Sequence, residues 1–85
     1  RMIDIKSRLA RYEIAVAKFY IEREAYVSAA NRGRYIVKYY SPSAEVEEAL
    51  EIMIDCYDKL GLDDLKQNAR QVLAANYPEN SLVRN

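Results

Sequence analysis

Residues 11–31, RYEIAVAKFYIEREAYVSAAN, decide the fold of this chain. Val16, Ala17 and Tyr20 recur at the spacing of one helix face, and Tyr26 and Ala29 open a second helix after a short turn. Two helices approach each other closely only where alanine or glycine leaves room between their backbones. Small and aromatic residues in this order therefore predict a tightly packed pair of helices.

Apolar residues repeat every three or four positions along nearly the whole chain, which predicts helices throughout. Turn residues are scarce, because the 85 residues include two glycines and two prolines, whereas strands need closely spaced turns. The expected helices cover about residues 2–24, 26–40, 44–60 and 62–77. They make one domain over residues 1–78, with helix pairs at about 2–40 and 44–77, followed by a polar tail at 79–85 that we expect to be disordered.

Local signals set the ends and the packing of these helices. Serine is a good N-cap, so Ser41-Pro42-Ser43 is expected to break the chain and start the third helix. Gly61 is expected to end that helix as its C-cap residue. Gly33 costs about 1 kcal/mol of helix propensity relative to alanine, so its place inside a helix indicates a close backbone approach. The expected inward set of the second helix is Val27, Ala30, Gly33, Ile36, Val37 and Tyr40.

The two halves of the chain repeat each other. Tyr20 matches Tyr57 at an offset of 37 residues, and Pro42 matches Pro78 at an offset of 36. A tetratricopeptide unit has about 34 residues, and slightly longer turns absorb the difference. The sequence therefore predicts an all-α fold of four antiparallel helices in two tetratricopeptide-like (TPR) repeats, part of an α-solenoid, with an ordinary four-helix bundle as the alternative.

An end repeat leaves one face uncovered, because each unit of a solenoid buries its core on its neighbours. The apolar stripe of the first helix from Ile5 to Tyr12 is therefore expected to be partly open. In a longer parent protein it would meet the preceding repeat, and alone it would be a dimerisation or partner surface. The chain opens with charged residues already in helical rhythm, so we expect it to be a piece of such a protein.

Composition argues against most chemical functions. The 13 basic and 13 acidic residues balance, whereas a nucleic-acid binder normally has a basic excess on one face. The chain has no histidine, the commonest general base, and no glycine-rich phosphate loop, so we expect no enzyme and no cofactor. Cys56 lies on an apolar stripe and is expected to be a buried structural thiol. Asp63 and Asp64 fit a helix start better than a metal site, and no metal is expected.

A candidate binding surface remains on the second helix. Arg32, Tyr35 and Tyr39 fall at i, i+3 and i+7, which places them on one face, and Ser28 extends that face by a turn. Arginine and tyrosine dominate binding hot spots because each joins a large contact area to directional polar groups. We expect Arg32 to pair with a partner's carboxylate between tyrosine contacts. In the alternative, Tyr35 and Tyr39 are half-buried against the third helix while Arg32 is solvated.

Several of these segments resemble one family. Residues 8–32, RLARYEIAVAKFYIEREAYVSAANR, are similar to the late repeats of the BamD family, also called ComL or YfiO, the lipoproteins of the bacterial outer-membrane β-barrel assembly machine (the BAM complex). The similarity continues in Tyr40, Pro42, Ala49, Leu50, Met53, Tyr57, Ala74, Ala75 and Asn76. It departs at Glu24, where the family usually has glycine in the turn, and at Ser41, inserted before the expected proline.

The resemblance implies a non-enzymatic scaffold of five TPR repeats on the periplasmic side of the bacterial outer membrane, of which this chain would be the last two. It also implies docking on the membrane-proximal POTRA domain of the barrel subunit BamA, near a small accessory BAM lipoprotein. Arg32 matches the family's POTRA-contacting arginine. The family's lipid-bearing cysteine lies near the mature N-terminus, outside this chain, so Cys56 is not its equivalent and that lipid is the expected membrane contact.

A second interpretation is a generic TPR adaptor that binds a short peptide in the groove lined by its first and third helices. It places the polar binding residues on those helices, for instance Lys18, Glu22 and Asp55, and not on the second helix. Binding to a purified POTRA domain, compared with binding to a peptide library, would distinguish the two interpretations.

Overall fold

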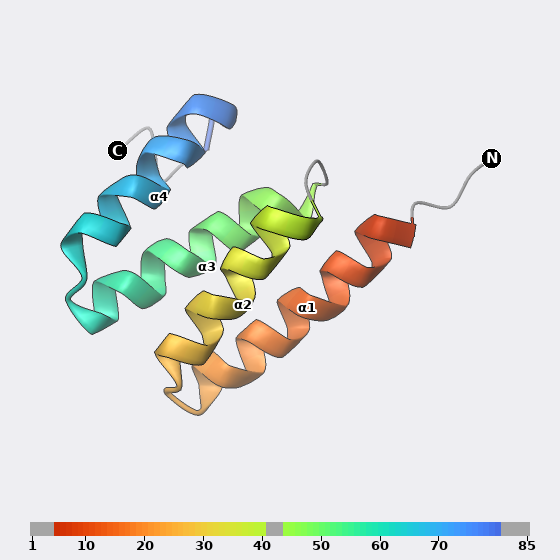
Figure 1. Cartoon of the computed structure of the whole chain (residues 1–85), viewed down its shortest axis with the longest axis horizontal. Helices are drawn as coiled ribbons and strands as arrows, with labels where there is room; N and C mark the ends of the chain where they lie inside the picture. The colour runs from red at the N-terminus through yellow and green to blue at the C-terminus, as the bar shows by residue number, and fades with distance from the viewer. Residues whose placement is uncertain (1–4, 41–43, 81–85) are drawn as a thin grey trace.

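The computed structural model describes residues 5–40 and 44–80, and within these ranges every regular element is a helix. The helices are α1 (Ile5–Glu22), α2 (Tyr26–Tyr39), α3 (Glu45–Leu60) and α4 (Asp63–Asn76). Consecutive helices run antiparallel (Figure 1), and α3 packs against the other three. None of the described helices combines the length and the apolar composition that crossing a membrane requires. The predicted all-α fold is confirmed.

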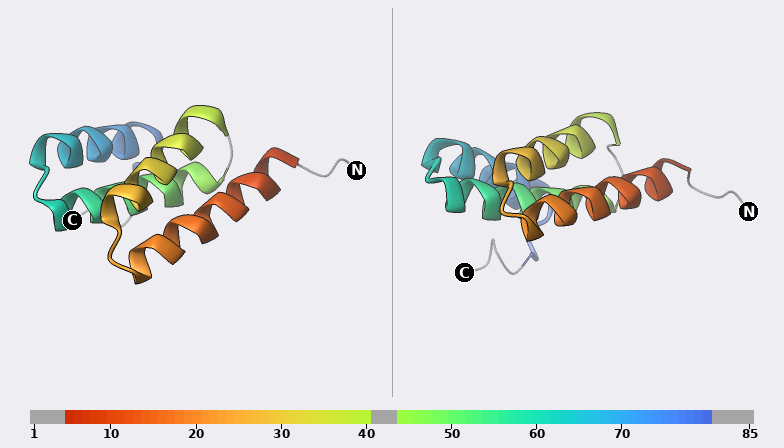
Figure 2. Two further views of the ribbon diagram at one scale, coloured as in Figure 1. Left: turned by 60° about the horizontal axis from the view of Figure 1, so that its bottom comes forward. Right: turned by 90° about the horizontal axis from the view of Figure 1, so that it is seen from below.

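The four helices form two layers, with α1 and α3 in one and α2 and α4 in the other (Figure 2). α3 lies against both helices of the first pair, α1 and α2, as the inner helix of each successive repeat does in a solenoid. No extensive contact joins α1 to α4 among the described residues, although a closed four-helix bundle would bring them together. The arrangement is therefore two TPR-like repeats and not the four-helix bundle of the alternative.

The turn from α3 to α4 is a Schellman motif, in which two amides beyond the helix bond back to its last carbonyls. The Gly61 amide donates to the Asp58 carbonyl at 3.1 Å, and the Leu62 amide donates to the Tyr57 carbonyl at 2.9 Å. Gly61 has a φ of 73°, in the left-handed region that residues with a Cβ enter only at a cost. Gly61 therefore ends α3 as the predicted C-cap residue.

The turn from α1 to α2 repeats this motif 37 residues earlier. The Glu24 amide donates to the Ile21 carbonyl and the Ala25 amide donates to the Tyr20 carbonyl, both at 2.9 Å. Glu24 takes the left-handed place of the motif with a φ of 62°, which explains why glycine suits this turn. Tyr20 and its counterpart in the second pair thus accept equivalent bonds, so the repeat is present in the backbone as well as in the sequence.

Replacing Glu24 by glycine should stabilise the chain, because Glu24 is the non-glycine residue that carries a positive φ among those described. A Cβ in this conformation costs roughly 1–2 kcal/mol, and the greater freedom of glycine in the unfolded chain offsets part of the gain. We expect the free energy of unfolding, measured by urea denaturation, to rise by about 0.5–1 kcal/mol. The reciprocal change Gly61→Glu should lower it by about 1 kcal/mol. If neither variant changed the urea midpoint, the two turns would carry no such strain.

Small residues mark the places where the helix backbones come closest. Ala17, Ala29 and Ala49, on three different helices, are fully buried. A Cβ added to Gly33 of α2 would lie 3.1 Å from the backbone carbonyl oxygen of Ala49 and 2.8 Å from Cγ of Met53. The close approach predicted from this mid-helix glycine is therefore confirmed, and the partner is α3. The largest fully buried side chains among the described residues are Ile36, Leu50, Leu73 and Cys56.

Two expectations about helix faces and caps are corrected. Val27 is 58% exposed and does not belong to the inward set of α2, because it lies about 120° around the helix from Gly33. The N-cap of α3 is Ala44, which makes no side-chain capping bond, and not a serine; residues 41–43 lie outside the described ranges. Three glutamates occupy the first turn of α3, where the helix dipole favours negative charge.

The polar tail expected from residue 79 onward is described only at Glu79 and Asn80, since residues 81–85 lie outside the described ranges. Asn80 is buried, and its Nδ2 donates hydrogen bonds to Oε2 of Glu47 and of Glu51, each at 2.6 Å. The two glutamates are one turn apart on α3, where like charges repel, and the two amide protons of an asparagine can bridge them. The expectation of disorder is therefore corrected for Asn80, which belongs to the packed body.

Candidate functional site

The candidate face of α2 points away from α3. Ser28, Arg32, Tyr35 and Tyr39 lie about 100–160° around the helix from Gly33, the residue that touches α3. Tyr35 is 40% exposed and Tyr39 is 54% exposed, and their ring centroids are 4.8 Å apart. The two tyrosines therefore form an exposed aromatic pair, and the alternative that placed them half-buried against α3 does not describe this surface.

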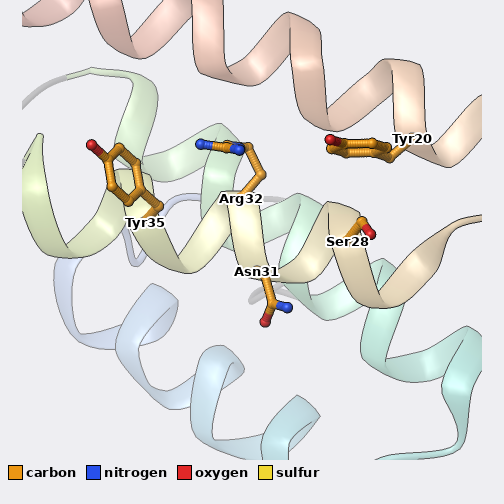
Figure 3. Close-up of a pocket in the computed structure, with 5 residues that line it drawn as sticks. All are labelled: Tyr20, Ser28, Asn31, Arg32 and Tyr35. Atoms are coloured by element: carbon orange, nitrogen blue, oxygen red, sulfur yellow. The ribbon is translucent and has the colours of Figure 1, made fainter.

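Three of these four residues line a pocket of about 290 Å³ between α1 and α2. Ser28, Arg32 and Tyr35 come from α2 together with Asn31, and Tyr20 comes from α1. Figure 3 shows Arg32 and Tyr35 extending from the side of α2 that faces α1, with the ring of Tyr20 between the two helices. We call this hollow the Arg32 pocket. It joins a cation, hydroxyl groups and aromatic rings in one partly exposed place.

Tyr20 and Asn31 are pocket residues that sequence reasoning did not assign to the site. Tyr20 was expected on the packing face of the first helix, and it is indeed half-buried beside the core. Its membership of the pocket depends on the angle at which α1 crosses α2, and no spacing within α2 carries that information. Asn31 could have been found, because it precedes Arg32 directly; Tyr39, which was predicted, lies beside Tyr35 and is not among the lining residues.

An ion pair holds the guanidinium of Arg32 in this pocket. Nη1 of Arg32 lies 3.0 Å from Oε1 of Glu13 on α1, and the side chain of Arg32 is 34% exposed while that of Glu13 is 14% exposed. Cζ of Arg32 is 5.5 Å from the ring centroid of Tyr35. A guanidinium has five N–H donors, so the pair with Glu13 leaves donors for a second acceptor. Arg32 is thus oriented in advance of any partner, whereas the sequence predicted it to be either solvated or partner-bound.

The phenol of Tyr40, next to the Arg32 pocket, adds a polar but uncharged group to this surface. Its ring meets that of Tyr35 edge-on with centroids 5.8 Å apart. Desolvation raises the pKa of Tyr40 above its usual value of 10.0, and the nearby Tyr35 and Glu13 raise it further. The hydroxyl therefore stays protonated at physiological pH and can donate a hydrogen bond. The charge at this surface comes from Arg32 and Glu13.

The residues considered as a nucleophile or as metal ligands have structural roles. Cys56 is fully buried, and this burial raises the pKa of its thiol to about 11, so the thiol is neutral and a poor nucleophile at physiological pH. Asp63 and Asp64 lie exposed in the first turn of α4, where they compensate the helix dipole. Within residues 5–40 and 44–80, no three acidic or cysteine side chains gather as metal ligands.

Two of the residues named for a peptide groove between α1 and α3 have other neighbours in the structure. Nζ of Lys18 lies 2.6 Å from Oε2 of Glu48, so this lysine ties α1 to α3. Asp55 lines a hollow together with Lys66 and Arg70 of α4. An ion pair between α1 and α3 therefore already engages Lys18, one of the polar residues that the adaptor interpretation assigned to peptide binding.

The apolar stripe of α1 is open, as expected from an end repeat. Leu9 is 47% exposed and Tyr12 is 66% exposed, and Phe19 continues the same stripe at 48%. Their counterparts 37 residues later on α3 are buried by the first helix pair: Val46, Ala49 and Cys56. The side chain of Ile5, where the predicted stripe began, lies outside the described part of the structure. α1 thus offers the surface that α3 buries against a preceding repeat.

Comparison with protein families matches residues 1–73 to YfiO, described as an outer membrane lipoprotein. The chain belongs to the YfiO family. The YfiO match runs from the start of the chain to the buried Leu73 of α4, so it includes the Arg32 pocket and parts of all four helices. The resemblance seen in residues 8–32 is therefore confirmed.

Curated proteins similar to this chain carry the name outer membrane protein assembly factor BamD. That of Vibrio cholerae is 38% identical over 89% of this chain and 32% of its own length. That of Pasteurella multocida is 41% identical over 89% of this chain and 29% of its own length. That of Neisseria meningitidis serogroup A is 39% identical over 98% of this chain and 31% of its own length. The chain therefore spans about a third of the length of the curated relatives that it matches.

Proposed function

We propose that this chain is a docking module of an outer-membrane protein assembly factor and acts as a scaffold without catalysis. The name shared by its relatives supports the assembly role, and the family description supports a place at the outer membrane, whose periplasmic side we propose as the location. The TPR-like stacking of the helices supports a scaffold, because such repeats present extended surfaces for partner proteins.

The partner that we propose is the membrane-proximal POTRA domain of the barrel subunit BamA, docked on the face of the Arg32 pocket. The observation that carries this proposal is a partly exposed guanidinium fixed by Glu13 beside the exposed rings of Tyr35 and Tyr39. A partner carboxylate would accept hydrogen bonds from the remaining donors of Arg32, since guanidinium and carboxylate match in shape. The two tyrosines would supply the surrounding contact area, and their exposed rings lose little side-chain freedom on binding.

The charge reversal Arg32→Glu should weaken binding to a purified membrane-proximal POTRA domain at least tenfold, since breaking a desolvated charge pair at an interface costs about 2–5 kcal/mol. Isothermal titration calorimetry measures the affinity. The matched control is Arg8→Glu, which makes the same charge change on α1 at an exposed side chain outside the Arg32 pocket. We expect this control to bind like the parent.

Salt adds a second measurement to the same titration. Salt screens the attraction between the guanidinium and the partner's carboxylate before the two surfaces meet, so the affinity of the parent chain should fall as the ionic strength rises, and that of Arg32→Glu should fall less. The proposed docking face would be wrong if Arg32→Glu, with an unchanged circular dichroism spectrum, bound the POTRA domain as tightly as the parent.

A further inference from the structure

A second hollow lies between α2, α3 and α4, with a volume of about 260 Å³. Its floor is formed by buried side chains, Leu50 and Tyr57 of α3 and Ala69 of α4. Its rim carries Leu65 and Val72 of α4, which are 45% and 41% exposed. We call it the α4 groove. Apolar side chains at the mouth of a cavity with an apolar floor are the usual lining of a ligand or peptide site.

The α4 groove occupies the same place in the second repeat as the Arg32 pocket does in the first. The five residues that line the Arg32 pocket have counterparts 37 positions later, and every counterpart lines the α4 groove: Tyr57, Leu65, Asn68, Ala69 and Val72. The chemistry changes between the two, because Leu65 replaces Ser28 and Ala69 replaces Arg32. The same fold position therefore gives a polar pocket in one repeat and an apolar groove in the other.

The α4 groove has a cation at its edge. Arg34 of α2 is the charged residue among those that line the groove, its side chain is exposed, and it has no ion pair with another described residue. Burial raises the pKa of the Tyr57 phenol on the groove floor above 10.0, and the positive charge of Arg34 opposes this rise. The guanidinium thus acts on the groove itself. Glu13 holds Arg32, whereas no carboxylate of residues 5–40 or 44–80 forms an ion pair with Arg34, so its guanidinium can meet a carboxylate from a partner.

We propose that the α4 groove binds a segment of a partner protein that presents an aliphatic or aromatic side chain next to an aspartate or glutamate. The apolar side chain enters the groove over Leu50 and Tyr57 and lies against Val72, and the neighbouring carboxylate accepts hydrogen bonds from Arg34. Arg32 and Arg34 project about 160° apart around α2, so this site is separate from the Arg32 pocket and stands whether or not that pocket docks a POTRA domain.

The test uses the ¹⁵N-labelled chain and capped synthetic peptides that differ only at two adjacent central positions: Leu-Glu, Leu-Gln, Ser-Glu and Ser-Gln. Nuclear magnetic resonance titration should show the backbone amides of Leu65, Ala69 and Val72 shifting with the Leu-Glu peptide. Its affinity should exceed that of the Leu-Gln peptide by about threefold, the usual effect of an exposed ion pair. Both leucine peptides should bind more tightly than both serine peptides. A further peptide, which ends in leucine with a free C-terminus, tests whether the groove binds the terminal α-carboxylate in place of an acidic side chain.

Variants assign the two parts of the interaction. Arg34→Glu should abolish the preference for Leu-Glu over Leu-Gln, and Arg8→Glu, the same charge change at an exposed position of α1, should leave it intact. Val72→Ser should weaken both leucine peptides equally. Arg32→Glu should change none of these values, so failure here is distinct from failure at the Arg32 pocket. The proposal is overturned if no peptide shifts the groove amides, if all four bind alike, or if only the free C-terminus binds.

Discussion

The change Gly33→Leu should lower the free energy of unfolding by about 3 kcal/mol, because it forces apart the two helices that make the most extensive contact in the fold. Even a single Cβ at this position would lie 2.8 Å from Cγ of Met53 and 3.1 Å from the carbonyl oxygen of Ala49. The side chain of Met53 can change rotamer, but the carbonyl belongs to the backbone of α3 and moves only with that helix. α2 and α3 must therefore separate, and buried side chains between them lose their contacts.

Thermal and urea unfolding of a short series measure this effect. For a domain of this size, 1 kcal/mol corresponds to a shift of roughly 4–8 °C in Tm, so Gly33→Leu should be well resolved from the parent. The Tm of Gly33→Ala should lie between those of the parent and Gly33→Leu, because the gain of about 1 kcal/mol in helix propensity opposes the crowding against α3. Lys38→Leu, at an exposed position of the same helix, is the control and should melt like the parent. A Gly33→Leu variant with the Tm of the parent would show that α2 does not depend on this approach.

The fold could be predicted because its signals are local. The apolar spacing indicates helices, the mid-helix Gly33 indicates a close approach of two backbones, and Gly61 indicates a helix end. Each of these features can be inferred from the residue type and its neighbours in the sequence. The prediction placed Val27 on the inward face because it is apolar. The residue type does not show whether a side chain lies at the edge of an apolar stripe or at its centre. The N-cap of α3 was missed for a similar reason, since Ala44 has no capping side chain and the first-turn glutamates act there through the dipole.

The site could be predicted only as far as one helix extends. The spacing of Arg32, Tyr35 and Tyr39 on α2 predicted that they share one face, and on that face the two tyrosines are exposed and Arg32 is half-buried. The carboxylate that holds Arg32 comes from Glu13 on another helix, and the pairing depends on how α1 crosses α2. Asn80 is a similar case, because its hydrogen bonds to α3 span about 30 residues of sequence and no local pattern predicts them.

The α4 groove was hidden from sequence reasoning for a different reason. Leu65 and Val72 read as ordinary members of an apolar helix stripe, but α4 is the last helix described and its stripe is only partly covered. The 37-residue offset would have revealed the groove once the first pocket was known, because the lining residues correspond position by position. Comparison of the two halves of an internal repeat thus predicts the lining residues of one site from those of the other, which neither half shows alone.

Exchanging the charges of Arg32 and Glu13 should separate the stability of the fold from the binding of a partner. The single change Arg32→Glu places a second carboxylate at the 3.0 Å contact now made with Glu13, whose side chain is only 14% exposed. This pair is intermediate between exposed and buried, so we expect a loss of about 2 kcal/mol in the free energy of unfolding. The double variant Glu13→Arg with Arg32→Glu restores opposite charges across α1 and α2. Its free energy of unfolding should return to within about 1 kcal/mol of the parent.

Binding should not recover in the double variant, because the exposed member of the pair is then a glutamate that repels an acidic partner. We expect its affinity for the membrane-proximal POTRA domain to stay at least tenfold below that of the parent, a difference of about 1.4 kcal/mol or more. Urea denaturation and isothermal titration calorimetry on the same preparations give both quantities. Recovery of binding together with stability would mean that Arg32 acts only by holding α1 to α2. In that case the docking face would have to be sought elsewhere, because the guanidinium would then be a structural tie between the first two helices.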